Sequence, residues 1–381
     1  MIGARALRRA LVAISAALLP AGAPAAPLPE RFTGAPPAEF AQALEVRPFV
    51  FPRDHGPHPE FRQEWWYVTG NLDATSGERF GFELTFFRFA LAPPLAGDAP
   101  PASSAWRTRT LYMAHFAVTD VARGRFRFMQ KLSREALGLA GAHSAPLRVW
   151  IDDWSLAQAA VAAGAGWTLQ AAQPGYEIEL TLEPRGAPVL NGEAGLSRKS
   201  DEPSAASYYY SIPRLDVRGR LLRDGRPLEV RGAAWLDREW GSGALGARQA
   251  GWDWFALQLD DGSALMFYAL RDRDGRRDPH SAGTWTPAQA GADAHPLASA
   301  DVAIDVTGEW RNARGERYPA GWRLQVPQLA LDVSVRPVLA DQELATTPRY
   351  WEGAVDVAGQ RAGRSVRGRG YVELVGYAQE R

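Results

Sequence analysis

Cysteine is absent from the sequence, which excludes disulfide bonds and a lipid anchor on an N-terminal cysteine. An excess of charge of either sign is also absent, because 43 Lys and Arg residues balance 43 Asp and Glu residues. A net charge of zero gives no electrostatic reason to expect nucleic acid or an acidic membrane as a partner. We therefore expect a fold that depends on its core alone and a partner that is neutral or apolar.

Long hydrophobic runs are missing as well, since no stretch approaches the roughly 18 apolar residues that a membrane-spanning helix requires. The apolar run Ala10–Leu19 is shorter, follows a basic start at residues 5–9 and precedes the small residues Ala23-Pro24-Ala25. This order is typical of a secretory signal peptide. We predict cleavage after Ala25, so that residues 1–25 are removed and the mature protein is soluble in the periplasm or secreted.

The common motifs of nucleophile elbows, zinc proteases and P-loops do not occur in the sequence. Residues 241–246 match G-x-G-x-x-G, but the segment that follows has the pattern of a strand, whereas a dinucleotide site needs a helix there. The acidic and histidine residues between positions 54 and 60 are interleaved with proline and glycine, as in a loop. We expect no nucleotide, no metal and no other cofactor.

Most of the chain shows the alternation of apolar and polar residues that is typical of β-strands. The clearest hairpins pair Glu64–Leu72 with Arg79–Phe89, and Leu111–Thr119 with Arg125–Leu132. Helical periodicity is confined to short segments. The pattern predicts a nearly all-β protein.

Length and an internal repeat indicate two domains. The strand pattern lapses between residues 185 and 207, and Ala114–Asp120 resembles Asp253–Leu259. Two β-barrels or sandwiches of about eight strands each fit the length. We place the first domain at residues 26–200 and the second at residues 201–381.

The segment from Trp235 to Gly243 is the richest in candidate chemistry. Alternation along a strand places Trp235, Asp237 and Glu239 on one face and Arg238 with its apolar neighbours on the other. Such a strand either leaves the core for solvent or lines a ligand cavity, and the 14 tryptophans favour a cavity with aromatic walls. The candidate ligand-binding residues are Trp66, His115, Trp235, Trp240, Trp252, Trp254 and Tyr268. His115 is also compatible with a satisfied core histidine.

Five ordered motifs carry a family resemblance. They are Glu64-Trp65-Trp66-Tyr67-x-x-Gly70, Asp237-Arg238-Glu239-Trp240-Gly241, Gly251-Trp252-Asp253-Trp254-Phe255, Tyr350-Trp351-Glu352-Gly353 and Gly370-Tyr371-x-Glu373-Leu374-x-Gly376-Tyr377. With them the sequence resembles the AttH-type, carotenoid 1,2-hydratase-like proteins. The resemblance implies two lipocalin-like β-barrels in tandem. Members of that family include hydratases of isoprenoid double bonds, secreted proteins described as hydrolases, and proteins associated with ABC-type export systems.

Hydratase chemistry, if it carries over, requires an acid that protonates a trisubstituted alkene before water captures the carbocation. The acid must stay protonated in a pocket of low dielectric constant, and aromatic faces must stabilise the cation. Asp237 beside Trp240, and Asp253 between two tryptophans, are the candidate catalytic residues. The resembling hydratases place a histidine near this aspartate, whereas this chain has Arg238 and Glu239. An arginine would hold a neighbouring carboxylate ionised, which argues against carotenoid hydration itself.

Four charged residues are expected to be structural: Glu64, Arg88, Arg238 and Glu239. Because a lone buried carboxylate is costly, Glu64 should pair with a cation such as Arg88 of the next strand, and the alternatives are a barrel mouth or ligand contact.

Two functions follow. The protein binds an isoprenoid or lipid, as a hydratase-like or hydrolase-like enzyme or as a carrier. Alternatively, it is a non-catalytic accessory that contacts the membrane subunits of an ABC exporter.

Overall fold

The computed structural model describes residues 40–93, 109–159, 166–243, 245–289 and 291–378. The predicted signal peptide lies outside the described residues. Within these ranges no helix has the length and the apolar character needed to cross a membrane. The regular secondary structure of the described residues is β-strand apart from three short 3₁₀ helices, η1 (Arg53–His55), η2 (Ser299–Asp301) and η3 (Pro327–Leu329).

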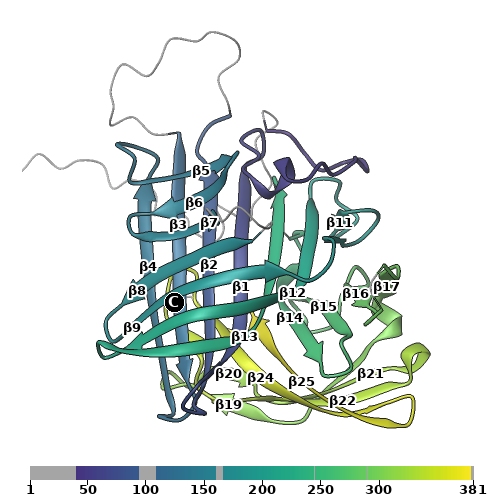
Figure 1. The fold of residues 1–381 in the computed structure, drawn as a ribbon. Helices are drawn as coiled ribbons and strands as arrows, with labels where there is room; N and C mark the ends of the chain where they lie inside the picture. The colour runs from purple at the N-terminus through teal and green to yellow at the C-terminus, as the bar shows by residue number, and fades with distance from the viewer. Residues whose placement is uncertain (1–39, 94–108, 160–165, 244, 290, 379–381) are drawn as a thin grey trace, which may run out of the picture.

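The first sheet is antiparallel and curls into a nearly closed barrel (Figure 1). Its order is β4-β3-β2-β1-β13-β12-β9-β8-β7-β6-β5, and β10 and β11 pair with β12. Lys131 of β4 forms ion pairs with Asp152 and Asp153, next to β6, so the two ends of the sheet approach each other. The strands are β1 (Gln63–Ala74), β2 (Arg79–Ala90), β3 (Thr110–Asp120), β4 (Arg125–Arg134), β5 (Ala140–Ser144), β6 (Leu147–Ile151), β7 (Trp154–Gln158), β8 (Trp167–Gln173), β9 (Tyr176–Pro184), β10 (Val189–Leu190), β11 (Leu196–Arg198), β12 (Ala206–Arg223) and β13 (Arg226–Gly241).

The second sheet is also antiparallel but forms a half-barrel, with the order β17-β16-β15-β14-β25-β24-β22-β21-β18 and β23 beside β24. A separate hairpin joins β19 to β20. The strands are β14 (Gln249–Leu259), β15 (Ala264–Asp272), β16 (Ala282–Thr286), β17 (His295–Ala298), β18 (Ala303–Val306), β19 (Glu309–Arg311), β20 (Arg317–Pro319), β21 (Trp322–Val326), β22 (Leu331–Pro337), β23 (Glu343–Leu344), β24 (Tyr350–Arg361) and β25 (Arg364–Leu374).

The predicted all-β class and both predicted hairpins are confirmed, because β1 pairs with β2 and β3 pairs with β4. Tight turns connect such strands. Gly262 in the turn between β14 and β15 has a φ of +90°, a conformation that side chains disfavour and that glycine adopts freely. The prediction of two barrels needs one refinement, since the second sheet does not close.

The change from the first sheet to the second comes between Gly241 and Gln249, later than the boundary predicted at residue 200. Strands β12 and β13 pair with β9 and β1 and therefore complete the first sheet. The segment between residues 185 and 207, where the strand pattern lapses, contains the short strands β10 and β11 of that same sheet.

Both faces of β1 and of the second half of β13, from Ala234 to Gly241, are largely buried. One face looks into the barrel, where Trp66, Leu236 and Trp240 belong to its hydrophobic core. The other face packs against the second sheet, where Tyr67 and Trp235 join residues of β14, β15, β24 and β25. We call this second region the intersheet layer, and it holds the polar residues described next.

Candidate active site

Asp237 lies in the intersheet layer and is 3% exposed. Its carboxylate accepts hydrogen bonds from the Tyr209 hydroxyl at 2.5 Å, the Ser211 hydroxyl at 2.5 Å and the Trp235 indole N–H at 2.6 Å. Burial opposes its negative charge and raises its pKa to about 7, although the three hydrogen bonds act in the opposite direction. Asp237 is therefore a carboxyl group that exchanges a proton near neutral pH.

Arg238 does not influence Asp237 in the way the sequence suggested, because the strand alternation turns the two side chains to opposite faces. The Arg238 guanidinium lies inside the barrel, where it forms an ion pair with Glu64 and stacks 3.8 Å from the Trp66 ring centroid. The predicted objection to a protonated Asp237 therefore does not apply.

Aromatic rings form the walls around Asp237. The Trp254 ring meets Tyr67 edge-on at 5.1 Å between centroids and Trp235 at 6.3 Å. Its indole N–H donates a hydrogen bond of 3.1 Å to the Tyr209 hydroxyl, which in turn donates to Asp237. Trp65 and Trp252 are only partly buried and pack at the border of the same cluster. The electron-rich ring faces are suited to a developing cation.

Further along the intersheet layer lie two more buried acids, Glu83 from the first sheet and Glu352 from the second. The sequence analysis assigned no role to either of them. Glu83 of β2 accepts a hydrogen bond of 2.5 Å from Thr85, and Glu352 of β24 lies beside the hydroxyls of Tyr67 and Tyr350. Burial raises the pKa of both carboxyls well above the usual range, and the repulsion between them adds to the effect on Glu352. Burial therefore disfavours the charged form of both acids.

Glu373 of β25 is a third acid of this kind, and it is only partly buried. It accepts a hydrogen bond from the Trp252 indole. Burial raises its pKa to about 8, and repulsion from Asp237 and Glu239 acts in the same direction. Glu352 and Glu373 both stand in motifs that carried the family resemblance. Their position could not be found from the sequence because nothing in it shows that β24 and β25 face β1.

Glu239 has a structural environment. It pairs with Lys199 at 3.4 Å and accepts a hydrogen bond from Ser207. The same lysine donates to Ser197 at 2.8 Å, and Ser197 is hydrogen-bonded to the Tyr268 hydroxyl at 2.9 Å. This network closes one side of the intersheet layer, so Tyr268 lies within the layer as a neighbour of Lys199.

Asp253 does not accompany Asp237. It lies on the other face of β14 from Trp252 and Trp254, where it accepts hydrogen bonds from Arg271 at 2.9 Å and from the Tyr377 hydroxyl at 2.9 Å. The prediction that places Asp253 in one pocket with the two tryptophans is wrong, because successive residues of a strand point to opposite faces.

Trp66 and Trp240 also lie apart from Asp237, inside the barrel. Trp240 stacks on His58 with 3.8 Å between centroids, and Trp66 donates a hydrogen bond of 2.8 Å to the His55 carbonyl. Both rings are fully buried in the barrel core. Asp237 and Trp240 therefore cannot line the same cavity, contrary to the pairing proposed from the sequence.

Glu64 is inside the barrel as well, and its predicted ion pair with Arg88 is confirmed. Arg238 provides a second cation that the sequence did not reveal. Although burial opposes the charge, the two arginines hold the Glu64 pKa well below its usual range. Glu64 is thus an ionised carboxylate in the barrel core.

His115 joins the two sheets. Its Nδ1 is 2.7 Å from the Tyr350 hydroxyl, and its Nε2 is 3.1 Å from the Gln130 amide. Burial lowers the His115 pKa to about 3, so the ring is neutral. This is the geometry of a buried histidine with both ring nitrogens hydrogen-bonded, which agrees with a role in the core more than with ligand binding.

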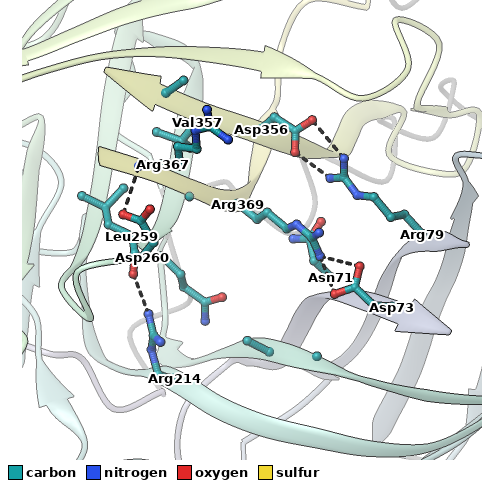
Figure 2. Close-up of a pocket in the computed structure, with 15 residues that line it drawn as sticks. Asn71, Asp73, Arg79, Arg214, Leu259, Asp260, Asp356, Val357, Arg367 and Arg369 are labelled. Carbon is teal, nitrogen blue, oxygen red and sulfur yellow. Dashed lines mark hydrogen bonds and ion pairs between the residues drawn. The ribbon is translucent and has the colours of Figure 1, made fainter. Parts of the chain in front are cut away.

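A pocket of about 650 Å³ opens at the other end of the intersheet layer (Figure 2). Two ion pairs cross between the sheets there, from Arg79 to Asp356 at 2.6 Å and from Arg369 to Asp73 at 2.8 Å. In the ranges described, no group of three or more His, Asp or Glu side chains is arranged to hold a metal ion.

The fold and this acid-rich layer define an all-β protein of two curled sheets. Residues 42–377 match the AttH-like family, so the chain belongs to that family. It is similar to a solved AttH-type protein from Nitrosomonas europaea, with 35% identity, a TM-score of 0.77 and coverage of 89% of this chain and all of the other.

Two further relatives are more distant. Kievitone hydratase from Nectria haematococca has the same fold, with 16% identity, a TM-score of 0.65 and coverage of 91% of this chain and 99% of the other. The dehydratase asqC of Emericella nidulans is 24% identical over 223 residues, and this match spans 54% of this chain and 60% of that relative.

Proposed function

We propose that this protein hydrates or dehydrates a small hydrophobic molecule at an isoprenoid-type carbon–carbon double bond, with Asp237 as the proton donor. The observation that carries the proposal is a buried carboxyl group with no cation among its hydrogen-bond partners and tryptophan rings around it. A proton donor for an alkene needs such a low-dielectric environment.

The hydrogen-bond donors around Asp237 suit this reaction. When Asp237 gives its proton to the alkene, a carboxylate and a carbocation form at the same time. The Tyr209, Ser211 and Trp235 donors are already aimed at the carboxylate oxygens and stabilise the new negative charge. The faces of Trp235 and Trp254 stabilise the cation until water adds. Dehydration follows the same path in reverse.

Access to Asp237 requires movement, because its surroundings are closely packed. Trp65 and Trp252 are partly exposed, in contrast to Trp235 and Trp254. We place the entrance at these two rings. The substrate is then a mostly apolar molecule that reaches Asp237 when they part.

The relatives support this proposal, since one is a hydratase and another a dehydratase by name. We further propose that the protein works in the periplasm or outside the cell and that a hydrophobic small molecule is its partner. This proposal rests on the N-terminal residue pattern and the balanced charge of the chain.

The test uses an ortho-prenylated phenol and its hydrated tertiary alcohol as probes. The purified protein should interconvert them, as followed by chromatography and mass spectrometry. Asp237→Asn should lower kcat by about 10²- to 10⁴-fold, because asparagine cannot donate the proton. Asp253→Asn is the matched control and should retain activity, since Asp253 faces away from the layer.

Equal loss in both variants would contradict the assignment of Asp237. Lack of turnover by the unaltered protein, with ABC-transporter membrane subunits co-purifying from native membranes, would support the accessory role instead.

A further inference from the structure

We infer that Glu373 is the second carboxyl group of the reaction, the base that takes a proton from the attacking water in hydration and the acid that protonates the departing hydroxyl in dehydration. The inference rests on the proposed function of Asp237. It also fixes how the substrate lies, with its reacting carbons between β13 and β25 on the face of Trp254 and its apolar remainder toward Trp65 and Trp252.

The strand register places Glu373 at the required position. Glu373 of β25 is the direct partner of Trp254 on β14, so both side chains are on the face that packs against the first sheet. Trp254 donates a hydrogen bond to Tyr209, and Tyr209 donates to Asp237. Asp237 and Glu373 therefore flank one indole ring from the two sheets.

The other acids of the layer are less suited to this role. Glu239 is committed to Lys199 and Ser207. Glu83 and Glu352 are at most 1% exposed, and Glu352, although it is the direct strand partner of Glu373, lies beside the hydroxyls of Tyr67 and Tyr350. Glu373 accepts its hydrogen bond from the partly exposed Trp252 and is itself only partly buried, so it can exchange protons with solvent.

The proton balance closes with these two groups and water alone. In hydration, the Asp237 O–H bond breaks as a C–H bond forms, water oxygen bonds to the carbocation, and the Glu373 carboxylate takes the proton that the water loses. Asp237 ends as a carboxylate and Glu373 as an acid, and one proton returns through solvent. No oxidant or reductant is needed.

The electrostatic surroundings of Glu373 support sharing of one proton. The groups that face it from the packed strands are Asp237 and Glu239 of β13, Tyr67 of β1, Glu83 of β2 and Glu352 of β24, and Lys199 lies beyond Glu239. With pKa values of about 7 for Asp237 and about 8 for Glu373, the pair holds roughly one proton between these pH values. That proton resides mainly on Glu373, the weaker acid, which is the state that starts dehydration, whereas hydration starts from the less populated state with the proton on Asp237. Activity should therefore follow a bell-shaped pH profile with its maximum there.

The experiment compares Glu373→Gln with the unaltered protein on the prenylated phenol in D₂O. We expect a loss of at least ~10²-fold in kcat, a retained uptake of deuterium into recovered alkene because Asp237 still protonates it, and loss of the low-pH limb of the profile. Glu373→Asp should recover part of kcat. Asp356→Asn removes an exposed carboxyl group of the same sheet and should change none of these readouts.

The outcomes separate the two proposals. Full activity of Glu373→Gln, while Asp237→Asn is inactive, overturns the role of Glu373 and leaves that of Asp237. Parallel loss of turnover and deuterium uptake in Glu373→Gln, without recovery in Glu373→Asp, also overturns it, because a structural role would give that result. No turnover by the unaltered protein overturns the proposed function itself.

Discussion

At the scale of single residues, two neighbours in the sequence of this protein lie in different electrostatic environments. Asp237 and Arg238 are consecutive, yet the first is surrounded by neutral donors and the second is paired with Glu64 inside the barrel. Inside the barrel, Arg88 and Arg238 balance the charge of Glu64, whereas in the intersheet layer burial raises the pKa of Asp237, Glu83, Glu352 and Glu373, and Glu239 is paired with Lys199. The pKa of a buried carboxyl group in this fold therefore depends more on the strand face that carries it than on its neighbours in the sequence.

A stability measurement tests this description of Asp237. Its pKa rises from an ordinary 3.8 to about 7 on folding, so the folded state binds more protons than the unfolded state between these values. Stability from this group is therefore present below its unfolded pKa and is lost as pH rises through the folded value. The Asp237→Asn variant has no carboxyl group at this position, so its stability does not fall with pH for this reason.

When the free energy of unfolding is measured at about pH 5 and about pH 8, the variant should gain stability relative to the unaltered protein by roughly 2–3 kcal/mol as pH rises. An unchanged difference at the two pH values would show that Asp237 is ionised throughout.

At the scale of elements, the sequence was sufficient to locate many of the strands but not to show which face of a strand lies in the candidate site. Alternation predicted β1 to β4 and placed Asp237 opposite Arg238 correctly. The pairings of Asp237 with Trp240, and of Asp253 with its two neighbouring tryptophans, failed because they joined residues an odd number of positions apart, which alternation puts on opposite faces. Alternation alone could not show which face holds the site, because β13 and β14 carry buried aromatic residues on both faces. The usual contrast between an apolar and a polar face was therefore missing. The boundary predicted near residue 200 does not coincide with the change of sheet between Gly241 and Gln249, since polar turns around β10 and β11 interrupt the pattern without ending the first sheet.

Close packing between strands of the two sheets gives a second prediction. A Cβ atom at Gly81 of β2 would lie 2.7 Å from the Ala354 side chain of β24 and 2.8 Å from the Tyr371 hydroxyl. Gly81→Ala should force the sheets apart and cost about 1–3 kcal/mol in urea denaturation. Gly308→Ala, where the nearest atom is 3.3 Å away, should cost less.

Adding Ala354→Gly to Gly81→Ala should recover part of the lost stability. Equal effects at Gly81 and Gly308, or no recovery in the double variant, would contradict this packing.

At the scale of the whole molecule, two kinds of contact join the sheets. The intersheet layer buries aromatic side chains over its length, and the two ion pairs at the 650 Å³ pocket are partly exposed (Figure 2). Exposed ion pairs contribute little to stability, whereas buried aromatic rings contribute much. The layer that carries the candidate chemistry is thus also the main connection between the sheets.

Removal of both ion pairs tests this division. Arg79→Gln combined with Arg369→Gln should lower the free energy of unfolding by no more than about 2 kcal/mol, and the effect should shrink as salt is added. Urea denaturation at low and high salt provides the measurement. A larger, salt-independent loss would mean that the ion pairs hold the sheets together.

The division of β13 between two faces also bears on how such a protein can change over generations. Substitutions at Trp235, Asp237 or Glu239 alter the intersheet layer without touching the barrel, whereas Leu236, Arg238 and Trp240 maintain the barrel without touching the layer. Inserting one residue into the strand would exchange the two sets and bury each in the wrong surroundings. We therefore expect an insertion in β13 to damage both the barrel and the layer, whereas a substitution on one face damages only one of them.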